Sequence, residues 1–260
     1  MLRRLLLPLL AACTALASSC AAGADVPTVA VAANLNFAMP EIAAAFGKST
    51  GREVKLAFGA SGNFSRQIRE GAPFELFLSA DEANVKSLVD AGRAADAGAV
   101  YAIGRLVLFA PKGSPVAVDP GLDGLADAVG RAAIKRIAIA NPDLAPYGQA
   151  AREALQRKGL WEALQGRVVL GENVNQAAQF ALAGGVDAAF LPLSIVVAPN
   201  FQGRGEHAVI PESLHAPISQ RMVLVQGAGE TARMLYRFMQ GPEARAILER
   251  YGFGLPPAVR

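Results

Sequence analysis

The sequence has few of the residues that build disulfides and transition-metal sites. Its 260 residues include two cysteines, Cys13 and Cys20, and two histidines, His207 and His215. Both cysteines precede residue 25, so the rest of the chain has no thiol for a disulfide framework or a thiolate metal site. No Asp or Glu forms a metal-binding spacing with the histidines, and we expect both of them at the surface of loops.

An excess of charge and long apolar runs are also missing. The formal net charge is +3, and without Arg3 and Arg4 there are 23 basic residues against 22 acidic ones. This balance gives no basis for nucleic-acid binding. No apolar run reaches the roughly 18 residues that a membrane-spanning helix needs. We therefore expect a soluble mature protein.

The first 24 residues have the order of a secretory signal peptide. Residues 1–4 are basic, residues 5–10 form a short apolar run, and small residues continue to Ala24. The small residues at 22–24 predict cleavage before residue 25 and a periplasmic protein. The alternative is a lipoprotein signal, with a lipid anchor at Cys13 or Cys20.

Short apolar runs alternate with longer segments of helical period along the mature chain. This alternation predicts an α/β fold with mostly parallel sheets flanked by helices. We expect strands at residues 29–33, 54–58, 76–79, 106–110, 137–140, 168–170, 186–190 and 222–225.

The length and the lack of a linker predict two lobes joined by crossing strands. The mature chain is long enough for two medium domains. We place the crossings near residues 105–110 and 218–225. Lobe 1 is then expected at residues 25–105, lobe 2 at 106–217, and a return segment to lobe 1 at 218–260.

Four strand-to-helix corners share one kind of chemistry. Ligands in open α/β sheets bind beyond the carboxyl ends of strands, where helix N-termini present unpaired N–H groups. These corners are rich in Gly, Ser, Asn and Tyr, and none carries Lys or Arg. They read Ala33-Asn34-Leu35-Asn36, Phe58-Gly59-Ala60-Ser61-Gly62-Asn63, Pro146-Tyr147-Gly148-Gln149 and Gly171-Glu172-Asn173-Val174-Asn175.

Neutral donors at helix N-termini predict a site for a small dianion. Glu172 is the one acid in these corners, so a protonated anion would find few acceptors. The pattern therefore favours molybdate, tungstate or sulfate over phosphate. Helix capping alone also explains such residues. A hydrolase using Ser61 is a remote alternative, because no histidine forms a recognisable triad with it.

At these residues the chain resembles the periplasmic molybdate-binding proteins of ABC importers, a branch of the type II periplasmic binding proteins. The match covers nearly the whole mature chain. Its most specific pieces are Val31-Ala32-Ala33-Asn34-Leu35, Phe58-Gly59-Ala60-Ser61-Gly62, Leu76-Phe77-Leu78-Ser79-Ala80-Asp81, Ala145-Pro146-Tyr147-Gly148 and Gly241-Pro242-Glu243-Ala244.

The resemblance implies a two-lobe type II fold and names the binding residues. Asn34 and Ser61 would bind molybdate or tungstate from lobe 1, and Tyr147 and Val174 from lobe 2, so that molybdenum enters as an oxyanion. Ala33 and Ala60 would add backbone donors. Pro192 stands where some members have a tyrosine, and we assign that donor role to Tyr147. No enzymatic activity and no cofactor are implied, and the expected partner of the monomer is a membrane permease.

Overall fold

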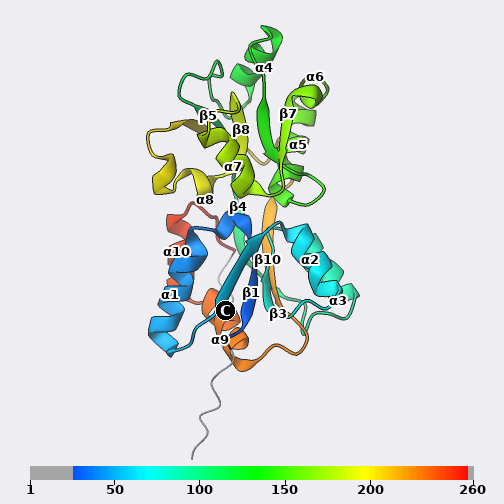
Figure 1. Cartoon of the computed structure of the whole chain (residues 1–260), viewed down its shortest axis with the longest axis vertical. Helices are drawn as coiled ribbons and strands as arrows, with labels where there is room; N and C mark the ends of the chain where they lie inside the picture. Colours follow the sequence, from blue (N-terminus) through cyan, green and yellow to red (C-terminus); the bar gives the residue numbers. More distant parts are fainter. Residues whose placement is uncertain (1–25, 257–260) are drawn as a thin grey trace, which may run out of the picture.

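The computed structural model describes residues 26–256. The expected signal peptide, with both cysteines, and the end of the expected return segment lie outside the described residues. Two lobes stand one above the other (Figure 1). Within the described part of the chain, no helix combines the length and the apolar character that crossing a membrane requires.

The first lobe contains a five-stranded sheet with both faces covered by helices. Its strand order is β2-β1-β3-β10-β4. The strands are β1 (Thr28–Ala32), β2 (Lys55–Gly59), β3 (Phe74–Leu78), β4 (Ala99–Gly104) and β10 (Ile218–Leu224). The helices are η1 (Ala33–Leu35), α1 (Ala38–Thr50), α2 (Ser61–Arg69), α3 (Ala83–Asp90), α9 (Glu230–Met239) and α10 (Pro242–Arg250).

Alternate residues of the central strand β1 belong to different cores. Val29 and Val31 pack in the cluster that contains α1, α9 and α10, whereas Ala30 packs in the cluster that contains α2 and α3. Because both faces are covered, the strand is continuously apolar from Val29 to Ala32 rather than alternating. Figure 1 shows α1 and α10 on one side of this sheet and α2 and α3 on the other.

The second lobe repeats this architecture. Its sheet has the order β7-β6-β8-β5-β9. The strands are β5 (Leu106–Pro111), β6 (Ile137–Ala140), β7 (Val168–Gly171), β8 (Ala188–Pro192) and β9 (Gly205–Val209). The helices are α4 (Asp123–Gly130), α5 (Pro146–Arg157), α6 (Trp161–Leu164), η2 (Gln165–Arg167), α7 (Val174–Leu182), α8 (Leu193–Val196) and η3 (Pro199–Phe201).

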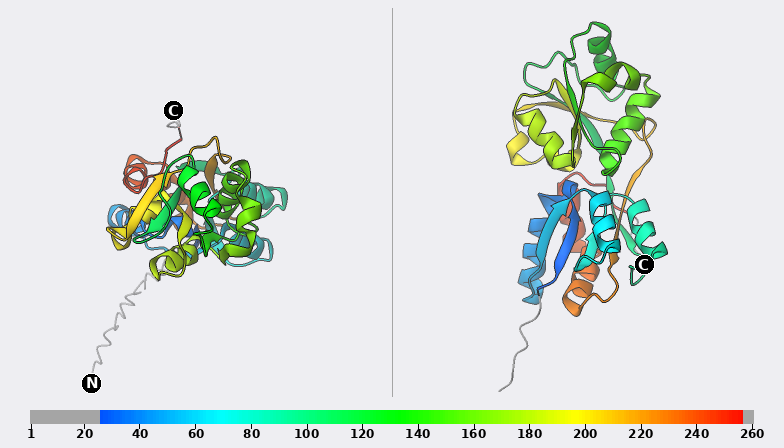
Figure 2. Two further views of the ribbon diagram at one scale, coloured as in Figure 1. Left: turned by 90° about the horizontal axis from the view of Figure 1, so that it is seen from above. Right: turned by 45° about the vertical axis from the view of Figure 1, so that its right-hand side comes forward.

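The chain passes between the lobes twice. It leaves β4 at Gly104 and enters β5 at Leu106, and it returns after β9 through residues 210–217 into β10. Figure 2 shows both passages close together at the junction of the lobes.

Each sheet is mixed rather than parallel throughout. In the first sheet β1 is parallel to both its neighbours, and β10 is antiparallel to β3 and β4. The second sheet has the same division, with β5 antiparallel to β8 and β9. The antiparallel strands β5 and β10 are the ones that enter from the other lobe. A parallel pair within one lobe needs a βαβ crossover, whereas a strand that arrives from the other lobe does not. The sequence pattern predicts the parallel part and misses β4 and the edge strand β9.

Candidate functional site

A small cavity lies where helix N-termini of the two lobes face each other. It is lined by Ala32, Ala33, Asn34, Gly59, Ala60, Ser61, Ala80, Ala145, Pro146, Tyr147, Asn173 and Val174. The cavity has a volume of about 10 Å³, which is the room for one water molecule. The lobes therefore meet closely around this point.

The first lobe contributes Asn34 and Ser61, both 1% exposed. Asn34 lies in η1 directly after β1, and Ser61 is the first residue of α2 after β2. Because β1 and β2 are parallel neighbours, their carboxyl ends bring the two corners together. Ser61 Oγ accepts a hydrogen bond from the backbone N–H of Ala80 at 3.0 Å. Its own proton stays available to a ligand.

The second lobe contributes the first turns of α5 and α7. Tyr147 follows Pro146 at the start of α5, and Val174 is the first residue of α7. First-turn N–H groups have no carbonyl partner within their helix. The side chain of Asn173 caps α7 by accepting from the N–H groups of Asn175 and Gln176. This cap leaves out the N–H of Val174, at the wall of the cavity.

The cavity wall is neutral. Among residues 26–256, its lining includes no Lys, Arg, His, Asp or Glu. Its one titratable side chain is Tyr147, whose pKa is raised above the usual value for tyrosine, chiefly by burial. The lining side chains are therefore uncharged at neutral pH, and the helix N-termini supply a positive partial charge.

Behind the cavity, Gln220 of β10 joins side chains of both lobes. Its Oε1 atom lies 3.0 Å from Asn34 Nδ2 and 2.8 Å from the hydroxyl of Tyr101. Its Nε2 atom lies 3.1 Å from the hydroxyl of Tyr147. Gln220 is completely buried. The sequence analysis missed it and Tyr101, although Gln220 falls inside the predicted crossing at residues 218–225.

Three further hydrogen bonds join the lobes around the cavity. Gly62 N donates to Leu144 O at 2.9 Å. Ser194 Oγ donates to Asn34 O at 2.7 Å, and Asn63 Nδ2 donates to the carboxylate of Glu172 at 2.9 Å. These contacts hold the cavity residues of the two lobes against each other.

All six residues that the sequence analysis assigns to the site line this one cavity: Asn34, Ser61, Tyr147, Val174, Ala33 and Ala60. Their individual binding roles stay predictions. Glu172 and Pro192 are not part of the lining.

The prediction that both histidines lie at the surface is wrong for His215. That side chain is 1% exposed, and its two ring nitrogens face the carbonyl oxygens of Ala216 and Ile210. His207 is exposed on β9. Within the described residues, no group of three or more His, Cys, Asp or Glu is placed to hold a metal ion.

Comparison with known proteins confirms the resemblance. The profile of the family described as "Bacterial extracellular solute-binding protein" matches residues 27–254. The "Molybdate-binding protein ModA" of Azotobacter vinelandii is 37% identical over 241 residues, which cover 91% of this chain and 93% of that protein. The protein of the same name from Rhodobacter capsulatus is 39% identical over 227 residues, 86% of each chain.

A solved structure gives the same result. The periplasmic molybdate-binding protein of Azotobacter vinelandii superposes with a TM-score of 0.80 and 32% identity, over 88% of this chain and 99% of that one. The present chain therefore belongs to the bacterial extracellular solute-binding proteins, in the family of the molybdate-binding protein ModA.

Proposed function

We propose that this protein captures molybdate, or tungstate, outside the cytoplasm and delivers it to the membrane permease of an ABC importer. The observation that carries the proposal is the cavity between the lobes, whose described lining offers neutral donors from both lobes and no charged side chain. Relatives at 37% and 39% identity that are named molybdate-binding proteins support the choice of ligand.

The proposed ligand contacts are donors only. Ser61 offers its hydroxyl from the first lobe. Tyr147 and Val174 offer first-turn N–H groups from the second lobe, on the side of the cavity that faces Asn34 and Ser61. Ala33 and Ala60 add backbone groups. A hydrogen bond to a charged group contributes about 1.5–3 kcal/mol. Six of them can offset desolvation of the anion and still give the roughly 8–12 kcal/mol of micromolar to nanomolar binding.

The absence of a carboxylate from the described lining favours a fully deprotonated anion. Hydrogen phosphate carries a proton that needs an acceptor, and leaving a polar group unpaired in a buried site costs free energy. Sulfate has the same protonation as molybdate and differs in size. It is therefore the alternative ligand that an experiment must separate.

The proposed cycle is capture, closure and release, without a covalent step or a cofactor. The residues proposed to bind the anion are buried between the lobes, so the lobes separate for entry and close again around the ligand. The hinge is then the pair of passages between β4 and β5 and between β9 and β10. We propose that the protein acts as a monomer in the periplasm, exported by residues 1–24 or anchored by a lipid on Cys13 or Cys20.

Isothermal titration of the mature protein with molybdate, tungstate, sulfate and phosphate tests the proposal. We expect tight binding of molybdate and tungstate, weak binding of sulfate and none of phosphate. A ligand that binds the folded state alone also raises the melting temperature, which provides an independent readout. Tighter binding of sulfate than of molybdate would make the protein a sulfate receptor, and binding of none of the four would refute the proposal.

A further inference from the structure

The hydrogen bonds around Gln220 cannot all form at once as the amides stand. The hydroxyl of Tyr101 lies 2.9 Å from the carbonyl oxygen of Ser79 and 2.8 Å from Gln220 Oε1. Both neighbours are acceptors, and a hydroxyl has one proton to donate. One of these two oxygen pairs is therefore left without a proton.

A second defect lies at Asn34. Its Nδ2 faces Gln220 Oε1, and its Oδ1 is the one buried side-chain nitrogen or oxygen in the described chain that has no hydrogen-bond partner. Leaving a buried acceptor unpaired costs about 1–3 kcal/mol. Gln220 contacts the nitrogen of the Asn34 amide, so the oxygen is the atom that remains to contact a ligand in the cavity. An oxygen acceptor there would repel an oxyanion.

Turning both amides by 180° removes the first defect and changes the second from an unpaired acceptor to an unpaired donor, since the oxygen and nitrogen of an amide group occupy equivalent positions. Gln220 Nε2 then donates one proton to Tyr101 and the other to Asn34 Oδ1. Tyr101 donates to Ser79 O, and Gln220 Oε1 accepts from the Tyr147 hydroxyl. The atom without a partner becomes Asn34 Nδ2, which is a donor.

We propose that Gln220 is a positioning residue that holds the amide of Asn34 with its oxygen inward and its N–H groups toward the anion. This inference rests on the proposed function, because it explains how a residue with an acceptor can belong to a site of donors. It also assigns Tyr147 its backbone N–H, rather than its hydroxyl, as the group that reaches the ligand.

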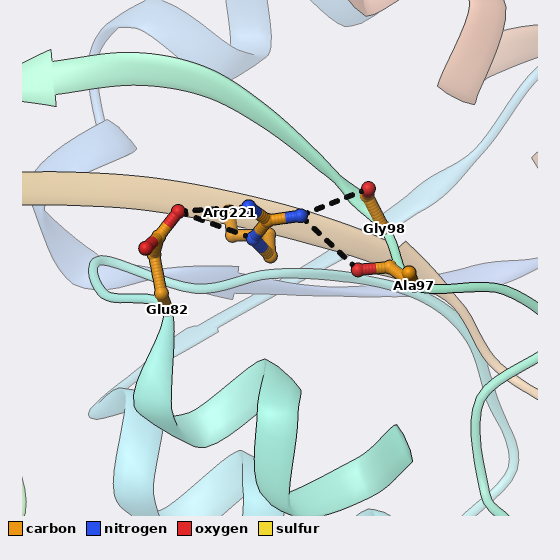
Figure 3. A network of polar contacts seen from close by, with 4 residues as sticks. All are labelled: Glu82, Ala97, Gly98 and Arg221. Carbon is orange, nitrogen blue, oxygen red and sulfur yellow. Dashed lines mark hydrogen bonds and ion pairs between the residues drawn. The ribbon is translucent and has the colours of Figure 1, made fainter.

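The strand around Gln220 is built to hold it in place. Gln220 is buried on the same side of β10 as Ile218 and Met222. The pairing of β10 with β4 shifts register between Gln220 and Arg221. Arg221 fixes this bulge by donating to Glu82 Oε1 at 2.9 Å and to the carbonyl oxygens of Ala97 and Gly98 at 3.2 and 3.1 Å (Figure 3). A change of register at this point would therefore break four hydrogen bonds from the Arg221 guanidinium group.

Nuclear magnetic resonance of the anion-free protein tests the amide orientation without reference to any ligand. We expect the side-chain N–H protons of Gln220 to give stronger cross-peaks to the ring protons of Tyr101 than to those of Tyr147. Through-bond correlation to the backbone of Gln220 assigns these signals in the wild type. Stronger cross-peaks to Tyr147 would overturn the proposal. A protein that binds no oxyanion would refute the proposed function, while this spectrum would still decide the orientation.

The positioning role is tested with molybdate. In the wild type, we expect the side-chain N–H signals of Asn34 to shift on addition of molybdate. In Gln220→Met, which keeps the length of the side chain but has no donor, we expect that shift to shrink and the affinity to fall about tenfold. A role in packing alone would lower the melting temperature and leave the Asn34 shift as it is.

The exposed Gln226, just beyond the end of β10, provides the matched control. Gln226→Met should bind molybdate within about twofold of the wild type. The proposal fails if folded Gln220→Met also binds within twofold, or if Asn34 shows no shift in a wild type that binds. If Gln220→Met does not fold, the wild-type spectra with and without molybdate still decide.

Discussion

Asn63 of α2 donates a hydrogen bond to Glu172, in the loop before α7, across the junction of the two lobes at 2.9 Å. Arg66 donates a hydrogen bond to the amide oxygen of the same asparagine, Asn63 Oδ1, at 3.1 Å. Neither Asn63 nor Glu172 lines the cavity. This contact therefore stabilises closure of the lobes without touching the ligand.

Replacing Asn63 by alanine is expected to weaken molybdate binding about two- to fivefold. The contact is exposed to solvent, and exposed charge-assisted contacts contribute about 0.2–1 kcal/mol. The loss should appear mainly as faster dissociation, because the closed form opens more often. Titration calorimetry and stopped-flow competition measure the two quantities.

Asn200→Ala, at an exposed asparagine of η3, serves as the control and should bind like the wild type. A loss of a hundredfold in Asn63→Ala would mean that Asn63 itself contacts the anion. An affinity equal to that of the control would mean that the contact does not affect closure.

Ser61→Ala should reduce molybdate affinity by about ten- to a hundredfold, since one hydrogen bond to a charged ligand contributes about 1.5–3 kcal/mol. The substitution also leaves the buried N–H of Ala80 without its acceptor, so a lower melting temperature is expected as well. Calorimetry well below the melting temperature separates the two effects.

Ser65→Ala is the matched control for Ser61. Ser65 is equally buried in the same helix, but its hydroxyl bonds to Asn84 O and Ser87 rather than facing the cavity. It should lose stability and keep its affinity. Equal loss of affinity in both variants would assign the effect to the helix as a whole.

The corners of the site could be predicted from the sequence because they depend on local chain order. A strand followed by a helix places its corner at the carboxyl edge of the sheet, and parallel neighbours bring such corners together. Asn34, Ser61, Tyr147 and Val174 line one cavity for this reason.

The residues behind the corners depend on contacts between distant segments. Asn34 and Gln220 are 186 positions apart, and no local pattern relates them. The same limit explains two other misses. Glu206 and His207 make the edge strand β9 read as a loop, and His215 is buried by contacts that its flanking prolines do not reveal.

Gly104→Ala is expected to disturb the site through Tyr147. A Cβ atom at residue 104 would collide with the hydroxyl of Tyr147 and would lie 2.6 Å from Gln220 Nε2. The Tyr147 ring and the start of α5 must then move. We expect at least a tenfold loss of molybdate affinity together with a lower melting temperature, measured by calorimetry and thermal unfolding.

Gly130→Ala is the control, because nothing lies within 4 Å of a Cβ at that position. There the change should leave binding unaltered and stabilise the fold slightly, by about 0.4–1 kcal/mol. Wild-type affinity in Gly104→Ala would show that the site tolerates displacement of Tyr147.

Alkaline pH should destabilise the fold through its buried tyrosines. Burial is the largest cause that raises the pKa values of Tyr147 and Tyr101 above the ordinary tyrosine value. Tyrosines of the unfolded chain ionise near pH 10. Above about pH 10 the folded state therefore keeps protons that the unfolded state has lost. The free energy of unfolding must then fall as pH rises, while these two groups contribute no slope between about pH 7 and 9.

Urea unfolding of the wild type and of Tyr147→Phe between about pH 9 and 11.5 measures this linkage. Each tyrosine that stays protonated in the folded state contributes about 1.4 kcal/mol per pH unit above its unfolded pKa. The Tyr147→Phe variant has one such tyrosine fewer. Its free energy of unfolding should therefore fall less steeply with pH, by about that amount, whatever its stability at pH 7. Equal slopes in the two proteins would mean that Tyr147 ionises in the folded state as readily as in the unfolded chain, and the closed, dry junction of the lobes would then not persist in solution.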